Sequence, residues 1–345
     1  MGKVKLTGAE IIWECLIREG VNVVFGYPGG AILPTYDALG KYSDKVHHVL
    51  TRHEQGATHM ADGYARSSGK VGVAMATSGP GAANMVTGLA TAMMDSIPIV
   101  CITGQVPRPA IGSDAFQEMD ISGAVIPVTK HSYLVMEIEN LAKTIKEAFA
   151  IARSGRPGPV LVDIPKDLQA EEFDFIYPEE PILLPGDNLV PSDIDLKSLE
   201  QAASLIAKSK RPVILAGHGI LLSGASSEVI ELSEKGNIPL SWTLLGSGAV
   251  PASHHLNMGM MGMHGEFAAN NAIQKADLLI ACGMRFDDRV TGNTNTYSLE
   301  SKKIHIEIDP SEINKNVPVD VALVGDLKSI LTKLIPLLKK QQNSS

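Results

Sequence analysis

The chain has 345 residues, of which 44% are hydrophobic and 20% are charged, and its formal net charge at pH 7 is -8. This length suits two domains that each bury a core, and the composition is that of a mildly acidic globular protein. Lysine and arginine are scattered, with no basic run longer than two residues, so the charge pattern of a nucleic-acid-binding protein is excluded.

The cysteines and the N-terminal segment bear on the compartment. Cys15, Cys101 and Cys282 are far apart and have no Cys-x-x-Cys spacing, so they indicate neither a disulfide framework nor a zinc site. The first residues contain no apolar signal core, and no uninterrupted apolar stretch is long enough to span a bilayer. We therefore expect a cytoplasmic protein without a membrane partner.

The first 165 residues alternate between predicted helices and strands. A helix begins after Thr7, which can form a capping box with Glu10, and it ends at Gly20. Strands are then predicted at 21–25, 46–50, 71–76, 97–103 and 159–164, and helices at 31–39, from Glu54 onward and at 141–153. Apolar strands that alternate with helices predict a parallel sheet covered on both faces.

A second α/β unit follows a change of composition. Residues 166–192 are rich in proline and acidic residues and have no sustained period, which predicts a linker. Helices are predicted at 196–209 and 327–338, and strands at 212–217, 238–242, 278–281 and 304–309, before a polar tail at 339–345. We expect two doubly wound parallel α/β domains, at 1–165 and 193–338.

Glu54 is the first candidate for chemistry. Small residues recur at helical spacing after it, so a flat ring or another backbone could approach that face closely. A weakly solvated carboxyl group in such a place suits acid–base work. The alternative is a glutamate that stabilises the helix N-terminus.

Two glycine-containing loops could admit a ligand. The loop at 77–84 follows a predicted buried strand and opens a helix, where glycine permits a tight turn and close backbone approach. It lacks both the Gly-x-Gly-x-x-Gly spacing and a P-loop lysine, so an ordinary strand-to-helix turn is the alternative. Gly29 could likewise leave room for a ligand or belong to a plain turn.

Charged and sulfur-containing segments are the remaining candidates. Arg156 and Lys166 are predicted loop cations that could meet a phosphate, a carboxylate or solvent. Methionines and glycines are interleaved at 258–265, where core filling is the alternative to a binding role. Arg285 and Arg289 could bind a diphosphate or carboxylate through paired hydrogen bonds, or form a solvated salt-bridge cluster.

The start of the second unit suggests a dinucleotide fold. Gly217-His218-Gly219 follows a predicted strand, but the third glycine comes late, at Gly224. The match to the Gly-x-Gly-x-x-Gly motif of dinucleotide-binding folds is therefore weak.

Six strings together resemble one enzyme family, in order and in spacing. The strings are Phe25-Gly26-Tyr27-Pro28-Gly29-Gly30-Ala31, Arg52-His53-Glu54-Gln55-Gly56-Ala57, Thr77-Ser78-Gly79-Pro80-Gly81, Gly112-Ser113-Asp114-Ala115-Phe116-Gln117-Glu118, Met261-Gly262-Met263-His264-Gly265 and Arg285-Phe286-Asp287-Asp288-Arg289-Val290-Thr291-Gly292. The family is the catalytic large subunit of acetolactate synthase (acetohydroxyacid synthase), a thiamine-diphosphate enzyme. The resemblance covers nearly the whole chain and corresponds to the first two of the family's three domains.

The resemblance implies a definite reaction. Thiamine diphosphate would decarboxylate pyruvate and join the two-carbon unit to pyruvate or 2-ketobutyrate, giving 2-acetolactate or 2-aceto-2-hydroxybutyrate for valine, leucine and isoleucine biosynthesis. Glu54 and Gln117 are the implied catalytic residues, with Glu54 bonded to the cofactor's aminopyrimidine ring. The other implied contacts with this cofactor are Pro80 and Asn84, and Arg156 is an implied cofactor contact. The implied substrate contacts are Gly29, Phe116, Lys166 and Arg289.

The resemblance also implies further groups and partners. FAD, without a net redox role, would lie on the second domain, at His264, Gly265, Gly283, Arg285, Glu307, Ile308, Asp309, Gly325 and Asp326. The Gly-Asp-Gly motif that holds Mg²⁺ and the diphosphate belongs to the family's third domain, so no metal ligand is predicted here and the chain alone is expected to be nearly inactive. A homo-oligomer with interface active sites and a possible regulatory small subunit are the implied partners.

Two alternatives to this function are open. One is another thiamine-diphosphate carboligase or oxidase, such as glyoxylate carboligase or pyruvate oxidase. The loop with Phe116 and Gln117 and the string at 285–292 favour acetolactate synthase over these enzymes. The other alternative is a truncated, non-catalytic flavin-binding subunit.

Overall fold

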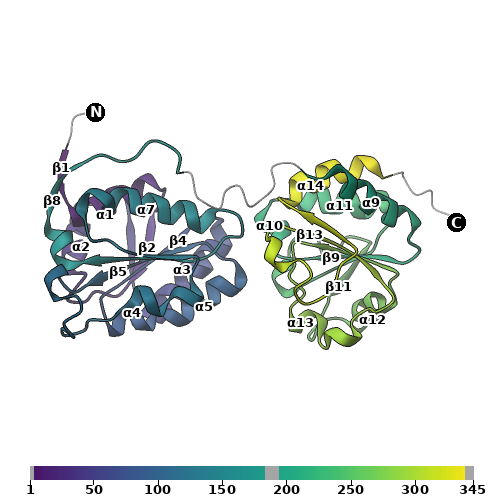
Figure 1. The fold of residues 1–345 in the computed structure, drawn as a ribbon, viewed down its shortest axis with the longest axis horizontal. Helices are drawn as coiled ribbons and strands as arrows, with labels where there is room; N and C mark the ends of the chain where they lie inside the picture. The colour runs from purple at the N-terminus through teal and green to yellow at the C-terminus, as the bar shows by residue number, and fades with distance from the viewer. Residues whose placement is uncertain (1–3, 183–193, 339–345) are drawn as a thin grey trace. The chain divides into compact units, whose positions relative to one another are not determined.

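The computed structural model describes residues 4–182 and 194–338, and its internal contacts divide the chain into two compact units. Each unit is a parallel sheet with helices on both faces (Figure 1). The predicted tail at 339–345 and the end of the predicted linker, 183–192, lie outside the described residues. Among the helices described, none combines the length and the apolar character that a membrane crossing needs.

The first unit contains a six-stranded sheet in the order β3-β2-β4-β5-β7-β6, and all its pairs are parallel. Its strands are β2 (Val23–Gly26), β3 (His47–Leu50), β4 (Gly72–Ala76), β5 (Ile99–Gln105), β6 (His131–Leu134) and β7 (Val160–Pro165). The strand β2 lies between β3 and β4, so the chain changes direction across the sheet there. In open α/β sheets, ligands bind at the carboxyl ends of the strands at such a switch point.

Helices cover both faces of this sheet (Figure 1). One face carries α1 (Gly8–Arg18), α2 (Leu33–Ala38) and α7 (Ile138–Arg153), and the other carries α3 (Glu54–Ser68), α4 (Pro80–Asn84) and α5 (Val86–Asp95). Shorter helices are α6 (Ile121–Ala124) and the 3-10 turns Leu39–Lys41, Arg108–Ala110 and Ile126–Val128. Strand β4 is buried throughout, with Val73 and Met75 in one core cluster and Ala74 and Ala76 in the other.

Residues 166–175 correct the start of the predicted linker. They form α8 (Lys166–Ala170) and β8 (Glu172–Phe175), and β8 pairs antiparallel with β1 (Val4–Thr7). Their burial supplies the reason, because Leu168 is fully buried and Phe173 and Phe175 pack against the core. Elements this short show no period in the sequence, and tertiary contacts hold them in place.

The second unit contains a six-stranded parallel sheet in the order β11-β10-β9-β12-β13-β14. The strands are β9 (Pro212–Ala216), β10 (Leu240–Trp242), β11 (Asn257–Met260), β12 (Leu278–Cys282), β13 (Lys302–Glu307) and β14 (Val321–Val324). Strands β10 and β11 follow β9 on one side of the sheet, and β12, β13 and β14 follow it on the other side. The switch point therefore lies between β9 and β12, as in dinucleotide-binding folds.

The second sheet is also covered on both faces (Figure 1). One face carries α9 (Leu196–Lys208), α11 (Ser226–Gly236) and α14 (Leu327–Leu334), and the other carries α12 (Phe267–Lys275) and α13 (Asp288–Thr291). Shorter helices are α10 (Gly219–Leu222) and the 3-10 turns Leu244–Gly246, Thr294–Thr296, Pro310–Glu312 and Ile335–Leu337. The predicted fold class, two doubly wound parallel α/β sheets, is confirmed.

Candidate active site

Glu54 is a buried carboxylate at the carboxyl edge of the first sheet. Thr51, directly after β3, donates its N–H to Gly26 O at 3.0 Å and so holds the turn between β3 and α3 against the end of β2. The helix cap is His53, whose Nδ1 accepts from Gln55 N at 3.1 Å. Glu54, 8% exposed, is therefore not the capping side chain, and its carboxylate is left for another role.

Asn84 holds one oxygen of Glu54. Its Nδ2 donates to Glu54 Oε2 at 3.0 Å across two helices, α3 and α4. Among the described residues, no group donates a hydrogen bond to the other oxygen, Oε1. A Cβ at Gly81 would lie 3.2 Å from Oε1 and 2.8 Å from Thr77 Cγ2. The missing side chain at Gly81 therefore keeps the second oxygen of Glu54 open to a ligand.

The two glycine-containing loops meet at the same edge of the sheet. Thr77 Oγ1 accepts from Ala31 N at 3.1 Å, and a Cβ at Gly29 would lie 2.5 Å from Thr77 Cβ. Gly79 has φ +55°, and a Cβ there would lie 2.5 Å from Gln117 O. The structure thus brings together the predicted segments around Gly29, Gly79 and Gln117, while Pro80, the first residue of α4, is exposed.

The loop 111–118 presents Phe116 and Gln117. The carboxylate of Glu118 accepts hydrogen bonds from two backbone groups of this loop, Gly112 N and Ala115 N, the latter at 2.9 Å. These backbone bonds lower the pKa of Glu118. Gln117 has φ +59°, and the Phe116 side chain is 88% exposed. An exposed aromatic side chain on a loop is available to contact a substrate.

Sequence reasoning missed a contact between a tyrosine and a histidine of the first unit. Tyr36 OH lies 3.2 Å from His48 Nε2. Burial, and then the negative charge of Glu54, raise the pKa of the Tyr36 phenol, and burial lowers the pKa of His48. These shifts favour a protonated phenol beside a neutral imidazole, and the imidazole tautomer decides which of the two donates. No local signal marks this pair, because Tyr36 and His48 come from separate elements.

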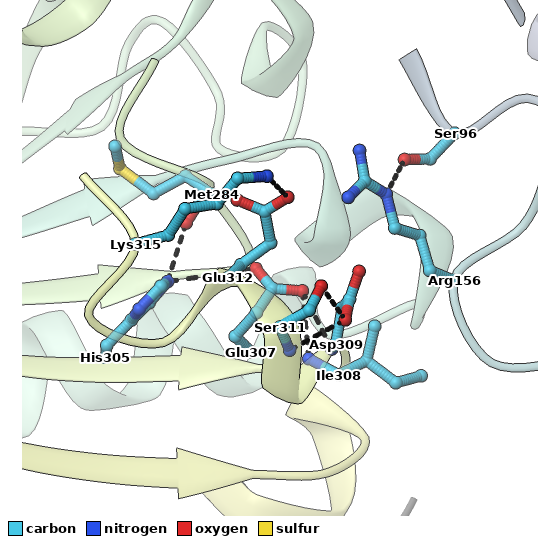
Figure 2. Close-up of polar contacts among 10 residues, drawn as sticks. All are labelled: Ser96, Arg156, Met284, His305, Glu307, Ile308, Asp309, Ser311, Glu312 and Lys315. Carbon is cyan, nitrogen blue, oxygen red and sulfur yellow. Dashed lines mark hydrogen bonds and ion pairs between the residues drawn. The ribbon is translucent and has the colours of Figure 1, made fainter. Parts of the chain in front are cut away.

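The two predicted cations lie on opposite edges of the first sheet. Lys166 is exposed and follows the carboxyl end of β7, on the same edge as Glu54, although it begins α8 and is not in a loop. Arg156 precedes β7 and donates from Nε to Ser96 Oγ at 2.8 Å, at the amino edge of the sheet (Figure 2). Arg156 therefore does not join the Glu54 cluster, and its cofactor contact stays a prediction.

Three glycines form a close crossing at the switch point of the second sheet. Gly219 N donates to Gly283 O at 3.0 Å, and a Cβ at Gly217 would lie 2.1 Å from the same oxygen. Gly283 has φ +60°, and a Cβ there would lie 2.6 Å from Gly219 Cα. No Cβ atom lies at the three glycines of this crossing, after the carboxyl ends of β9 and β12, which is the setting in which a dinucleotide approaches the backbone.

Predicted carboxylates lie along the carboxyl ends of β13 and β14. Glu307 Oε1 accepts from Ile308 N at 2.9 Å, and Asp309 Oδ1 accepts from Ser311 N at 2.9 Å (Figure 2). Asp326 caps α14 by accepting from Ser329 N at 2.9 Å. Gly325, with φ +149°, precedes it. These carboxylates and Gly283 thus share one edge of the second sheet.

The two sequence strings of the second unit also lie together. Met263 N donates to Arg289 O at 2.7 Å, and Arg289 Nη1 lies 3.4 Å from Met263 Sδ. Gly262 permits this approach, because a Cβ there would lie 2.5 Å from Arg289 O. The neighbouring predicted residues are His264, which is exposed, and Gly265 and Arg285, which are half-buried. Within residues 4–182 and 194–338, no group of three or more acidic, histidine or cysteine side chains could hold a metal ion.

Family models match both units. The N-terminal, cofactor-binding domain of thiamine pyrophosphate enzymes matches residues 6–124, and their central domain matches residues 199–334. The acetolactate synthase of Mycobacterium bovis is 52% identical over 337 residues, which cover 97% of this chain and 54% of that protein.

Other relatives give the same result. The acetolactate synthase large subunit of Parasynechococcus marenigrum is 48% identical over 334 residues, covering 96% of this chain and 54% of that protein. The acetolactate synthase large subunit of Corynebacterium glutamicum is 50% identical over 335 residues, covering 97% of this chain and 53% of that protein. The chain therefore spans about half the length of the curated relatives it matches.

Proposed function

Because this chain belongs to the acetolactate synthase large-subunit family of thiamine pyrophosphate enzymes, we propose that its first unit holds the aminopyrimidine ring of thiamine diphosphate in the synthesis of acetohydroxy acids. The substrates are pyruvate and a second 2-keto acid, either pyruvate or 2-ketobutyrate, and the products are 2-acetolactate and 2-aceto-2-hydroxybutyrate. When bound, the cofactor supplies the carbon nucleophile and the electron sink for decarboxylation. The observation that carries the proposal is the open oxygen of Glu54 beside Gly81.

Glu54 acts on the cofactor ring through Oε1. Asn84 fixes the orientation of the carboxylate by donating to Oε2, so the direction of Oε1 is also fixed and needs no change during the reaction. Glu54 is 8% exposed, and a hydrogen bond in such weakly solvated surroundings is electrostatically stronger than one in water. Glu54 therefore holds a proton between Oε1 and a ring nitrogen, which suits a residue that tunes the basicity of the ring.

The neighbouring loops provide the substrate side of the site. Gly29 contacts substrate through its backbone, and its loop can lie close to Thr77 because a Cβ there would lie 2.5 Å from Thr77 Cβ. Gln117 lies against Gly79 and borders the cofactor, and the exposed ring of Phe116 contacts the second keto acid. Lys166, a cation on the same edge, attracts the substrate carboxylate. Pro80 packs against the cofactor ring at the start of α4.

The role of Glu54 is tested by Glu54→Gln in the enzyme that contains this chain together with the family's diphosphate-binding domain. Glutamine keeps the shape and an acceptor for Asn84 but cannot exchange a proton, so turnover should fall by about two orders of magnitude or more. The matched control is Glu139→Gln, because Glu139 also lies in the first turn of a helix, α7, and is exposed. Near-normal turnover of Glu54→Gln would refute the role.

We further propose that the second unit binds FAD without a net redox role. The support is the glycine crossing of Gly217, Gly219 and Gly283 at the switch point between β9 and β12. The proposed contacts around it are His264, Gly265, Arg285, Glu307, Ile308, Asp309, Gly325 and Asp326. Arg289 is proposed to contact substrate, and Arg156, a residue of the first unit, stays a proposed cofactor contact. Absence of bound flavin absorbance and fluorescence after reconstitution of the chain would contradict this proposal.

The remaining proposals concern assembly. In the family, Mg²⁺ and the diphosphate are held by a third domain, so we expect that the 345-residue polypeptide assayed by itself forms no acetolactate. Measurable formation without an added partner would contradict this expectation. A product assay on pyruvate with the completed enzyme separates acetolactate synthase from another carboligase or oxidase of the same cofactor family.

We also propose a homo-oligomer with interface active sites and a regulatory small subunit. The proposed compartment is the cytoplasm. It is supported by the three cysteines, which are all free and buried.

A further inference from the structure

Asp163 is a buried carboxylate to which the proposed function assigns no role. It lies on β7 and is 1% exposed. Thr103 Oγ1 donates to its Oδ1 at 2.6 Å, and Gln105 Nε2 donates to its Oδ2 at 2.8 Å. Thr103 and Gln105 both come from the neighbouring strand β5, and each oxygen of Asp163 therefore has a donor.

Gln105 connects this carboxylate to the loop that carries Phe116 and Gln117. Its Oε1 accepts from Val106 N at 2.8 Å, which fixes the orientation of the amide group. The Nε2 group then donates one hydrogen to Asp163 and the other to Met119 O at 2.9 Å. The Gln105 side chain, 4% exposed, thus makes every bond from a single orientation.

Met119 lies two residues after Gln117, where the backbone needs support. Gln117 has φ +59°, a conformation that residues other than glycine adopt at a cost unless their surroundings hold it. The Gln117 carbonyl lies against Gly79, whose loop leads to Gly81 and Asn84 beside Glu54. A continuous path of contacts therefore runs from Asp163 to the candidate active site.

We propose that Asp163 and Gln105 are positioning residues that fix the Met119 carbonyl and thereby hold Gln117 against Gly79, beside Glu54. The inference rests on the proposed function, in which Phe116 and Gln117 border the substrate. Glu118 supports the same loop from within, through its bonds to Gly112 and Ala115. The loop is thus held at both sides of Gln117.

The ionisation of Asp163 fits this role. Burial raises its pKa to about 6, against the effect of the bonds from Thr103 and Gln105, and the charge of Asp120 at the start of α6 adds to the rise. At neutral pH the group is mainly ionised, which is the form that accepts from both donors. When Oδ1 is protonated at lower pH, it can donate to Thr103, and Oδ2 still accepts from Gln105, as in Asp163→Asn.

Hydrogen exchange of the 345-residue chain tests the proposal without any assay of activity. Asp163→Ala and Gln105→Met should each speed exchange of the amide hydrogens of residues 111–120 by about tenfold or more, because each removes hydrogen bonds that restrain the loop. Asp163→Asn should keep near-normal exchange, since its amide can donate to Thr103 and its oxygen can accept from Gln105. Asp62→Ala is the matched control, because Asp62 is a buried carboxylate of the same unit that bonds Arg66 instead.

Exchange in β4 reports whether the first unit of each variant is folded. If Asp163→Ala unfolds the unit, Gln105→Met carries the test, because it leaves the bond between Asp163 and Thr103 in place. Unchanged exchange of 111–120 in Gln105→Met overturns the proposal. An effect of Asp163→Asn as large as that of Asp163→Ala also overturns it.

Kinetics of the completed enzyme give a second, separable readout. A loosened loop should raise KM for pyruvate by about tenfold, whereas mere loss of folded enzyme lowers apparent kcat and leaves KM unchanged. Asp163→Asn should restore the normal KM. If the completed wild-type enzyme forms no acetolactate, the proposed function fails, and the exchange experiment still decides whether Asp163 positions the loop.

Discussion

The amide of Asn84 donates a 3.0 Å hydrogen bond to Oε2 of Glu54, and this bond orients the one buried carboxylate at the start of α3. The donor is neutral, so it holds the carboxylate without cancelling its charge. The bond also joins α3 to α4, whose first turn contains Gly81. The position of Glu54 and the shape of the loop beside it are therefore set together.

Asn84→Ala should impair the site without unfolding the first unit. Loss of a hydrogen bond to a charged group costs about 1.5–3 kcal/mol, so turnover of the completed enzyme should fall by about 10- to 150-fold as Glu54 loses its fixed orientation. Steady-state kinetics with pyruvate provide the measurement. Asn140→Ala, on the exposed surface of α7, is the control and should be silent. Equal activity of the two variants would show that Asn84 does not orient Glu54.

Gly81→Ala should close the open oxygen of Glu54. The new Cβ would lie 3.2 Å from Oε1 and 2.8 Å from Thr77 Cγ2, so a methyl group would occupy the approach to the carboxylate. We expect the concentration of thiamine diphosphate needed for half-maximal activity to rise by about tenfold or more, since 1.4 kcal/mol of lost binding has that effect. This constant is measured by titrating cofactor into the apoenzyme.

Gly63→Ala is the matched control for Gly81→Ala. Gly63 lies in α3, and a Cβ there would meet no atom within 4 Å. Alanine in a helix interior is more stable than glycine by about 0.5–1 kcal/mol, so this variant should melt slightly higher and bind cofactor normally. A normal cofactor titration for Gly81→Ala would contradict the assigned geometry.

The sequence predicts local features of this protein well and distant contacts poorly. The capping box of Thr7 and Glu10 and the start of a helix at Glu54 are both confirmed, because each depends on residues within one turn. The partner of Glu54 is 30 residues away, and the partner of Asp163 at Gln105 is 58 residues away. Such pairs arise only when parallel strands bring their carboxyl ends to one edge, and no single-sequence period encodes which side chains then meet.

The buried His305 makes the stability of the second unit depend on pH. It is fully buried, and its Nε2 donates to Met284 O at 2.7 Å (Figure 2). Burial lowers its pKa, although the bond to Met284 and the charge of Glu312 oppose the shift. The unfolded chain therefore binds a proton more readily below pH 6.5, the ordinary histidine pKa, so the second unit loses stability as the pH falls through that value.

His305→Gln should flatten this pH dependence, because glutamine can donate to Met284 but does not titrate. One proton corresponds to a slope of at most about 1.4 kcal/mol per pH unit. The measurement is the protection factor for hydrogen exchange in β13 between pH 5 and 8, compared between His305→Gln and the wild type. His255→Gln, at an exposed histidine of the same unit, should leave the slope unchanged. An identical slope in His305→Gln and wild type would assign the effect to other groups.

A comparison of Gly283 with Gly224 distinguishes the cost of backbone strain from the cost of steric contact in the second unit. Their φ angles are +60° and +61°, but a Cβ at Gly283 would lie 2.6 Å from Gly219 Cα, whereas one at Gly224 would meet no atom within 4 Å. Gly224→Ala should therefore cost only the left-handed conformation, about 1–2 kcal/mol. Gly283→Ala should lower the melting temperature further and abolish flavin retention, because the segments that follow β9 and β12 must move apart at the proposed site. Equal melting temperatures, measured on the two purified variants, would show that the glycine crossing is not closely packed.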